Sequence, residues 1–386
     1  MKYDYIFVGF GLSSMLVLFE MSKNKFFFDK KILIIEPQSK TEKDRTWCYW
    51  ETSNGAWDFL LKNKWESAWF QSGEIQLNIL KTDVVYKMIE SDDLYAFVKN
   101  IIKINLQTEW VSSSVTSISD TKNEVIVQTD ASMYRASKVF NAVIFDNCFK
   151  NNKQYPLINQ HFLGWFVAID DKYRASMPAI FMDFNVMQHN NTRFMYVLPC
   201  ANNQVLIEYT LFSKNLLHDY EYESEIKQYL NSKQIFDYTI QRKEKGCIPM
   251  TAYPFWKHNT ENILNIGTAG GWTKASTGFT FSNSRKKALQ VVTFLQKKQN
   301  PDFKIFHSTS RYYFYDQILI EVLSNSNHLG KLIFTKMFAK SNAASILRFL
   351  DESSTFWEEL QIIWACPKRP FIKAFFKVLF KNFKKI

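Results

Sequence analysis

The glycine-rich turn near the start of this 386-residue chain constrains its fold more than any other feature. The stretch "YDYIFVGFGLSSMLVLFEMSK" opens with an apolar run, Tyr5 to Val8, which is typical of a buried strand. Residues 13–21 then have the apolar spacing of a helix. A second apolar run, "KKILIIEPQ", predicts another buried strand that ends at Glu36. Strand, turn, helix and strand form a βαβ unit, so the pattern predicts a parallel sheet.

The turn has the form G-x-G-x-x-S, a variant of the dinucleotide-binding fingerprint. Gly9 allows the tight turn, and Gly11 lets the backbone approach a pyrophosphate at the N-terminus of the helix that starts near Ser13. Ser14 replaces the third glycine, and Glu36 ends the next strand, where a ribose hydroxyl needs an acceptor. The alternative is an ordinary tight turn with a surface glutamate. The N-terminal position, followed by a long insertion before the sheet resumes, favours FAD over NAD.

The rest of the pattern predicts an α/β (α+β) protein whose domains are interleaved. "KVFNAVIFD" is typical of a buried strand that returns to the first sheet. Runs such as "GWFVAID" and "RFMYVLP" then indicate a mainly antiparallel region, and the chain becomes largely helical after "NILNIGTAGGWT". We therefore expect a discontinuous Rossmann-type FAD-binding domain (1–150 and 260–300), an antiparallel substrate domain (151–259) and a helical C-terminal region (301–386).

Composition excludes several classes of protein. Apolar residues make up 46% of the chain, so it is not disordered. The net charge is +11, but no nucleic-acid-binding motif accompanies it, so we expect no nucleic-acid partner. Five widely spaced cysteines without C-x-x-C favour a reducing cytoplasm over a disulfide framework, and six scattered histidines predict no metal site. Neither a signal peptide nor an apolar run of about 18 residues is evident. The 35 phenylalanines fit either ordinary core packing or a long apolar ligand.

One carboxylate, Glu208, lies within the apolar run of "YVLPCANNQVLIEYT". Because side chains alternate along a strand, Glu208 shares one face with Leu206 and Thr210, opposite Ile207 and Tyr209. Glu208 therefore lies either on the wet face of an ordinary sheet or in an apolar site. In an apolar site, desolvation would raise its pKa and keep the carboxyl protonated.

Four stretches in order, "VGFGLSS", "DRTWCYWE", "YVLPCANNQVLIEYT" and "IGTAGGWTKASTGFTF", resemble the bacterial FAD-dependent lycopene β-cyclase family. The resemblance covers Tyr3 to about Phe281 and becomes loose after Lys287. It implies FAD in its reduced form, with NADPH as the electron donor. It also implies lycopene as substrate, cyclised without net redox change to γ-carotene and then to β-carotene with its β-ionone rings. The family's catalytic acid, in a Glu-x-Thr motif, falls on Glu208.

The resemblance also implies the other site residues, although Thr268 stands where many FAD enzymes carry Asp, and the family's Pro and Tyr are replaced by Ala275 and Phe279. The stretch "GCIPMTAYPF" (246–255) predicts a loop toward the same site. The implied cofactor-binding residues are Gly9, Gly11, Ser13, Ser14, Glu36, Arg45, Gly267, Thr268, Ala269, Gly270, Thr277 and Gly278. The implied substrate-binding residues are Trp47, Trp50, Tyr209 and Phe279. For "DRTWCYWE" the alternative is a surface arginine with two core tryptophans.

Two other functions fit the same sequence features. The first is a FAD-dependent monooxygenase or another flavin oxidoreductase acting on a lipophilic substrate, which would share the Rossmann-type part. The second is a lipid or carotenoid carrier without flavin and without turnover. Substrate-dependent NADPH consumption with oxygen would favour the first, and the absence of a flavin absorption band would favour the second.

The C-terminal stretch "CPKRPFIKAFFKVLFKNFKKI" has a helical period after Pro370. Its apolar side consists of Phe371, Ile372, Phe375, Phe376, Leu379 and Phe383, and its basic side of Lys373, Lys377, Lys381 and Lys384. The pattern predicts a basic amphipathic helix that contacts membrane lipid through residues 371–385. The alternative is a packed terminal helix with a solvated lysine face. Because lycopene is insoluble, we expect a cytoplasmic protein attached peripherally to the inner face of the cell membrane.

Overall fold

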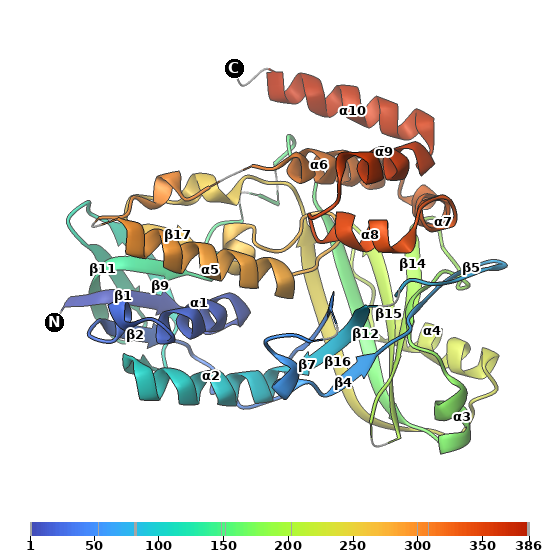
Figure 1. The fold of residues 1–386 in the computed structure, drawn as a ribbon, viewed down its shortest axis with the longest axis horizontal. Coiled ribbons are helices and arrows are strands. Elements are labelled where there is room, and N and C mark those ends of the chain that lie inside the picture. The colour runs from blue at the N-terminus through green and yellow to red at the C-terminus, as the bar shows by residue number, and fades with distance from the viewer. Residues whose placement is uncertain are drawn as a thin grey trace.

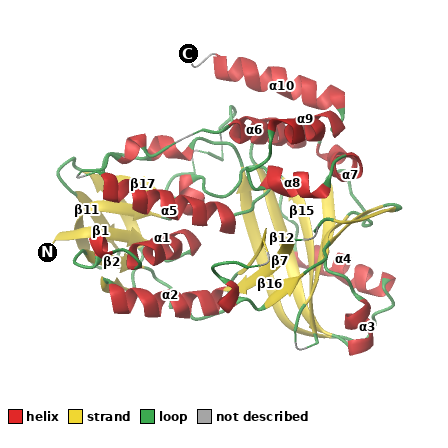
Figure 2. Ribbon diagram, viewed as in Figure 1, coloured by secondary structure: helices red, strands yellow, loops and turns green. Residues whose placement is uncertain are grey.

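The fold consists of two large sheets side by side, with a layer of C-terminal helices beside the second sheet (Figure 1). This architecture comes from a computed structural model that describes residues 2–52, 54–80, 83–147, 149–150, 152–201, 203–298, 300–307 and 309–383. Figure 2 shows the strands gathered in the two halves of the molecule, with α1 and α5 drawn between them and α6 to α10 above. The predicted α/β class is confirmed.

The first sheet has the order β8-β2-β1-β11-β10-β9, and β17 pairs with the end of β11. Neighbours from β8 to β11 are parallel, whereas β11, β10 and β9 are antiparallel. Its strands are β1 (Lys2–Val8), β2 (Lys31–Ile35), β8 (Gln107–Val111), β9 (Val115–Asp120), β10 (Val125–Thr129), β11 (Met133–Asn141) and β17 (Ile263–Asn265). Helices α1 (Leu12–Ser22), α2 (Ser91–Asn105) and α5 (Phe281–Lys297) pack together beside this sheet around a buried apolar core. The βαβ unit predicted at the N-terminus is present as β1, α1 and β2.

The second sheet has the order β16-β12-β15-β14-β13-β5-β6 and is antiparallel except between β13 and β5. Its strands are β5 (Trp69–Ser72), β6 (Ile75–Asn78), β12 (Ile158–Ala168), β13 (Ile180–Asp183), β14 (Thr192–Pro199), β15 (Gln204–Ser213) and β16 (Thr239–Met250). Helix α4 (Asp219–Ser232) packs on β12 and β15, and α3 (Asp171–Ser176) lies nearby. Strands β5 and β6 come from the N-terminal third of the chain but belong to the second sheet, so the chain passes between the two halves of the molecule more than once. The predicted domain boundaries remain a prediction.

A small third sheet connects the two halves. It has the order β3-β7-β4 and consists of β3 (Thr46–Thr52), β4 (Asn63–Trp65) and β7 (Val84–Glu90). Strand β3 carries most of the "DRTWCYWE" stretch and contacts α5, and Figure 1 shows β7 and β4 between the two halves. This sheet therefore brings the tryptophan-rich segment to the junction of the large sheets.

The C-terminal region is helical, as predicted. Its helices are α6 (Arg311–Asn325), α7 (Gly330–Lys340), α8 (Ala343–Leu350), α9 (Phe356–Ala365) and α10 (Lys368–Phe383). Helix α7 packs on β14, β5 and β6, α9 packs on α7 and α8, and α10 runs along α6. Among the described residues, no helix is long and apolar enough to cross a membrane.

One predicted loop is partly wrong. In the predicted loop over 246–255, residues up to Met250 continue strand β16, paired with β12 from Ile158 onward. Gly246 and Pro249 suggested a break in the pattern. Gly246 is needed because the Phe162 ring lies over it, 2.3 Å from where a Cβ would be. Met250 is fully buried, so packing in the core stabilises the strand up to its last residue.

Candidate active site

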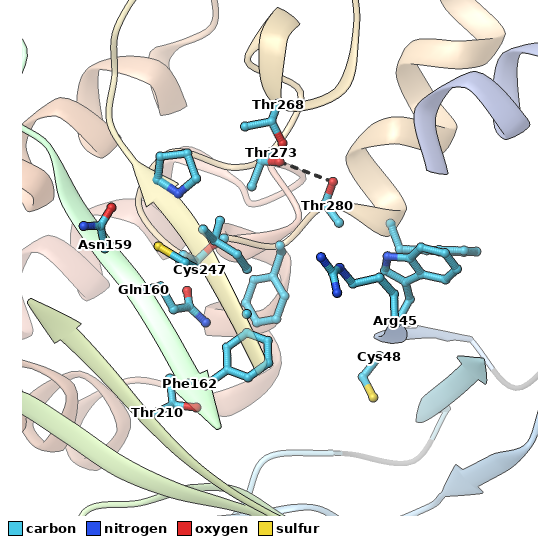
Figure 3. A pocket seen from close by; sticks show the side chains of 18 of the residues that line it. Arg45, Cys48, Asn159, Gln160, Phe162, Thr210, Cys247, Thr268, Thr273 and Thr280 are labelled. Carbon is cyan, nitrogen blue, oxygen red and sulfur yellow. Dashed lines mark hydrogen bonds between the residues drawn. The ribbon is translucent and has the colours of Figure 1, made fainter. Parts of the chain in front are cut away.

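A cavity of about 1020 Å³ lies at the junction of the two large sheets. Its walls come from the start of α1, the start of β3, the turns after β17, one face of the second sheet, and helices α7 and α8. Figure 3 shows this convergence, with Thr268, Thr273 and Thr280 on one side, Arg45 and Cys48 on another, and β12 and β15 side chains on a third. The volume is at the upper end of the range for ligand pockets, and the site is large enough for a cofactor and a substrate end.

The end of the cavity next to the first sheet fits an anionic ligand. Gly11 precedes α1, and no side chain caps the N-terminal N–H groups of that helix. A Cβ at Gly11 would meet no protein atom within 4 Å and would project into the space where a pyrophosphate would bind. Gly9 adopts a φ of +88°, which favours glycine, and Ser14 Oγ donates to its carbonyl oxygen at 2.7 Å. Ser13 lines the cavity beside Gly11.

The turns after β17 complete this end of the cavity. Gly267 has a φ of +59°, and a Cβ there would lie 3.1 Å from Ser13 Oγ, so this residue must be small for the two segments to meet. Thr268, Thr277 and Gly278 also line the cavity. Thr277 Oγ1 is buried and has no hydrogen-bond partner in the described structure. A ligand hydroxyl or ring nitrogen would satisfy it, so these residues fit a bound flavin nucleotide.

Four predicted cofactor residues lie at the edge of the cavity or behind it. Arg45 lines the mouth but is exposed, and its guanidinium donates to the Asp44 carbonyl at 2.6 Å. Glu36 accepts from the backbone N–H of Phe10 at 2.8 Å, so it already braces the glycine-rich turn. Ala269 is buried behind the cavity wall, and a Cβ at Gly270 would lie 2.1 Å from the Asn265 carbonyl oxygen. Gly270 is therefore required by the chain's own packing.

Glu208 lies in the wall of the cavity, on the central strand β15. The side chain directly across on β14 is Tyr196, and on the other side Gly164 of β12 and then Glu244 of β16 continue the row. All four share one face of the sheet. A Cβ at Gly164 would lie 3.0 Å from Leu206 Cδ1 and 3.2 Å from Glu208 Cβ, so the glycine gives these two side chains room against β12.

Burial raises the pKa of Glu208 to about 8, and the nearby Glu244 carboxyl acts in the same direction. Thr210 Oγ1 donates to Glu208 Oε1 at 2.7 Å and partly opposes this rise. The side chain is only half-buried by area because its exposed part faces the cavity. Of the two sequence interpretations, the geometry matches the apolar site and not the ordinary wet face, because the face of Glu208 forms the wall of a mostly apolar cavity.

Several polar groups around Glu208 were missed by sequence analysis. Tyr86 and Tyr196 share a hydrogen bond between their hydroxyls at 2.8 Å, and Cys48 lines the same part of the cavity. Glu244 accepts from Thr46 through both the backbone N–H at 3.0 Å and Oγ1 at 2.7 Å, which fastens the start of β3 to the second sheet. The sequence did show Glu244 and Gly246 alternating on one face of a strand that ends at a buried methionine. It could not show that Glu244 reaches Thr46, which lies about 200 residues earlier.

The four predicted substrate-binding residues separate into two pairs. Trp47 and Phe279 line the cavity. Trp50 lies behind the cavity wall, where its ring contacts the Phe279 ring edge to face, with the two ring centroids 4.7 Å apart. The prediction for Tyr209 was wrong: it is fully buried on the opposite face of β15, beneath α4, and accepts from Arg193 at 3.1 Å. Strand alternation placed it there because Glu208 faces the cavity.

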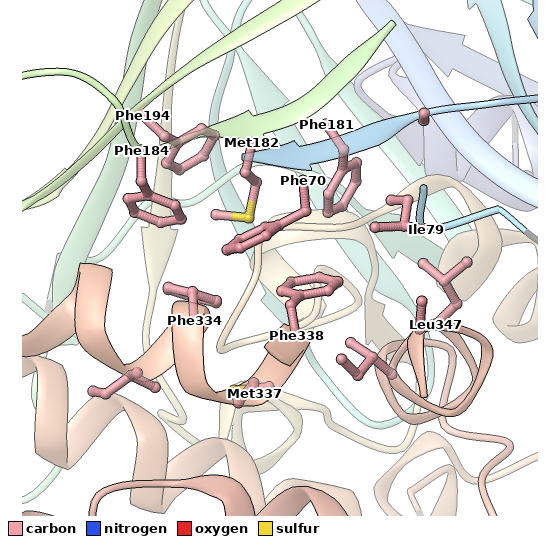
Figure 4. Close-up of a cluster of buried hydrophobic side chains, with 14 of the residues drawn as sticks. Phe70, Ile79, Phe181, Met182, Phe184, Phe194, Phe334, Met337, Phe338 and Leu347 are labelled. Carbon is pink, nitrogen blue, oxygen red and sulfur yellow. The ribbon is translucent and has the colours of Figure 1, made fainter. Parts of the chain in front are cut away.

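The far end of the cavity is apolar. Figure 4 shows aromatic and methionine side chains from the second sheet meeting those of α7 and α8. The members of this cluster that line the cavity include Phe181, Met182, Phe194, Phe334, Met337, Phe338 and Ile346. The cavity therefore has a polar end that suits a nucleotide and an apolar end that suits hydrocarbon, and Glu208 lies on the sheet between them.

Comparisons with known proteins agree with this fold. A family model described as lycopene cyclase protein matches residues 4–375. A lycopene β-cyclase from Pantoea ananas is 24% identical over 75% of each chain, and one from Pseudescherichia vulneris is 23% identical over 64% of this chain and 62% of that enzyme.

Solved structures share the architecture at low identity. A geranylgeranyl bacteriochlorophyll reductase-like protein from Thermoplasma acidophilum has a TM-score of 0.59 and 14% identity, covering 98% of this chain and 99% of that one. The flavin-dependent brominase Bmp2 has a TM-score of 0.62 and 12% identity over all of both chains. The halogenase PltM in complex with phloroglucinol and FAD has a TM-score of 0.58 and 11% identity, covering 96% and 87%. The fold is thus one that flavoproteins adopt. The family model spans almost the whole chain, so the chain belongs to the lycopene cyclase family.

Proposed function

We propose that this protein is a flavin-dependent lycopene β-cyclase, which closes the ends of lycopene into β-ionone rings and yields γ-carotene and then β-carotene. The observation that carries the proposal is Glu208, a carboxyl with a pKa of about 8 in the wall of a mostly apolar cavity. At neutral pH such a group is mostly protonated and is poised to act as an acid. Family membership supplies the substrate class.

In the proposed reaction, Glu208 gives its proton to the terminal double bond of the polyene. Thr210 donates to Oε1, so the proton is carried on Oε2. The resulting tertiary cation is attacked by the neighbouring double bond, which closes the ring, and transfer of a ring proton to the Glu208 carboxylate restores the acid and completes an isomerisation without net redox change. The apolar wall, which includes the aromatic residues Phe162 and Phe194, would exclude water that could trap the cation.

FAD is the proposed cofactor, held at the polar end of the cavity in its reduced form with NADPH as electron donor. Gly11, Ser13 and the N-terminus of α1 would bind the pyrophosphate, while Thr268, Thr277 and Gly278 would contact the ribityl chain and ring. When bound, the reduced ring supplies negative charge that stabilises a cation electrostatically. The FAD in the PltM structure supports this assignment.

The test is pigment analysis in a lycopene-producing bacterium. The wild type is expressed beside Glu208→Gln and a matched control, Glu223→Gln, on α4 across the sheet, where Glu223 pairs with a surface lysine. We expect γ- or β-carotene from the wild type and the control, and at least about a 100-fold lower rate from Glu208→Gln.

Other outcomes would identify a different function. Cyclised product from Glu208→Gln at the wild-type rate would remove Glu208 as the acid. Unchanged lycopene with flavin bound and NADPH consumed would favour a flavin monooxygenase, and unchanged lycopene without any flavin band would favour a carrier.

A further inference from the structure

The last two described helices, α9 and α10, expose an unusual amount of apolar surface. We call the following side chains the terminal apolar surface: Phe356, Trp357, Leu360, Ile363 and Trp364 of α9, and Ile372, Phe375, Phe376 and Phe380 of α10. Trp357 and Trp364 are 74% and 79% exposed. Elsewhere, exposed aromatic residues such as Tyr220 and Phe236 are scattered singly, which is normal for a surface.

Charged residues of these helices turn toward the protein. Glu359 is fully buried and forms hydrogen bonds to Arg311 at 2.8 and 2.9 Å. Glu358 pairs with Arg348. On α10, Lys377 and Lys381 both bind the buried Glu321 of α6. An ordinary surface helix buries its apolar stripe and exposes its charges, so the arrangement here is largely inverted.

This finding differs from the packed-helix alternative, in which the apolar side would face the protein and the lysines would face water. Among the described apolar side chains of α10, the fully buried ones are the small Ala374 and Val378, and Phe371 is partly buried. The rings of Phe375, Phe376 and Phe380 follow one another along the exposed side, with centroids 5.4 and 6.3 Å apart. Residues 384 and 385 of the predicted lipid-contacting range lie outside the described residues.

The charges that remain exposed are basic. Lys368, Arg369 and Lys373 are exposed at the start of α10, whereas both acidic residues of α9 are paired with arginines. Lys368 also connects the two helices, because its Nζ lies 3.9 Å from the centroid of the Trp364 ring. Aromatic side chains beside exposed lysines match the interface of an anionic membrane. A protein–protein interface is typically depleted of lysine.

We propose that the terminal apolar surface docks on an anionic lipid bilayer, with the aromatic side chains among the acyl chains and Lys368, Arg369 and Lys373 at the phosphates. This proposal rests on the exposed surface alone. A consequence that also rests on the proposed function is substrate entry: α8 packs against α9, and its residues Ile346 and Leu350 line the cavity. An insoluble polyene would then pass from the bilayer to Glu208 without crossing water.

The experiment is vesicle flotation of the full chain, which needs no substrate and no activity. Vesicles consist of phosphatidylcholine alone or mixed with phosphatidylglycerol. The variant Trp357→Ser/Trp364→Ser is compared with the matched control Tyr220→Ser/Phe236→Ser, whose residues are 70% and 72% exposed. We expect at least about a tenfold loss of partitioning for the tryptophan variant and wild-type partitioning for the control, with unchanged thermal unfolding of both.

A second variant tests the charges. Lys368→Ala/Lys373→Ala should lose about tenfold in binding to mixed vesicles and little in binding to phosphatidylcholine alone, and salt should reproduce the loss. Equal flotation of the wild type and the tryptophan variant would overturn the proposal, as would a wild type that does not float. Concentration-dependent dimerisation that the same tryptophan variant abolishes would assign the surface to a second copy of the chain instead. A protein that floats but forms no cyclised product would retain this proposal and reject the proposed function.

Discussion

The two faces of strand β15 differ in polarity in the sequence and have opposite surroundings in the structure. Val205, Ile207 and Tyr209 are fully buried beneath α4. Leu206, Glu208 and Thr210 line the cavity. On the packed face most polar groups have protein partners, as in the hydrogen bonds of His161 to Tyr222 and Ser213, and the exception among the described residues is the buried Nε1 of Trp165.

On the cavity face, by contrast, polar groups keep unused bonding capacity. Within the described structure, Glu208 has one hydrogen bond, and the Thr277 hydroxyl and the side-chain amide oxygen of Gln160 have no hydrogen-bond partner. Packing against a helix therefore stabilises the strand on one side, while the other side holds a desolvated acid. If this comparison is right, substitutions on the two faces should separate stability from chemistry.

The largest expected effect is on the pH dependence of stability. The pKa of Glu208 is raised from 4.5 to about 8 in the folded protein. Between these values the unfolded chain has released this proton and the folded chain still holds it, so the free energy of unfolding should fall as pH rises. The slope from this group is at most about 1.4 kcal/mol per pH unit.

Urea unfolding of the wild type and Glu208→Gln from pH 5 to pH 9 measures this slope. Glutamine does not titrate, so the variant should lose the contribution of Glu208 and gain stability relative to the wild type as pH rises. Parallel curves for the two proteins would mean that the Glu208 carboxyl is well solvated and ionises near 4.5.

Gly164→Ala should have the next largest effect. The added methyl would lie 3.0 Å from Leu206 Cδ1 and 3.2 Å from Glu208 Cβ, so the carboxyl must move. We expect about a tenfold lower cyclisation rate per folded protein, because misplacement of an acid by a fraction of an ångström slows proton transfer. Val167→Ala, on the opposite face of the same strand, is the control, and it should lower stability but not rate. A similar rate loss in both would contradict the separation of faces.

The comparison of the two faces of β15 also explains which features of the site could be predicted from the sequence. The glycine-rich turn, the βαβ unit and the position of Glu208 on a strand depend on local pattern, and the structure has each of them. The surroundings of Glu208 depend on Gly164 and Glu244, which reach it only through the registers of β12 and β16. No local pattern encodes a register between strands so far apart in the chain.

The Tyr209 prediction failed for a related reason. Proximity in sequence to Glu208 suggested proximity in the site, but neighbouring strand residues point to opposite faces. The C-terminal helix shows the same limit: its two sides were visible in the sequence, while the inward direction of Lys377 and Lys381 follows from Glu321 on another helix.

Tyr209→Phe should affect stability alone. It removes the hydroxyl that accepts from Arg193 at 3.1 Å on the packed face, which should cost about 1 kcal/mol of unfolding free energy. The cyclisation rate and the ratio of γ- to β-carotene should stay at wild-type values. A changed pigment ratio with unchanged stability would return Tyr209 to the substrate site.

The smallest effect, and the sharpest test of the cavity face, is expected for Thr210→Val. The Thr210 hydroxyl donates to Glu208 Oε1 and lowers its pKa, so removing it should raise that pKa above about 8. In the proposed reaction the protonated form is the active one, so the alkaline limb of the pH–rate profile should move to higher pH, by less than about one unit. A loss of hydroxyl packing alone would lower the rate equally at every pH, and a shift to lower pH would mean that Thr210 stabilises the protonated carboxyl. Only an upward shift fits an acid whose protonation is controlled by the cavity wall.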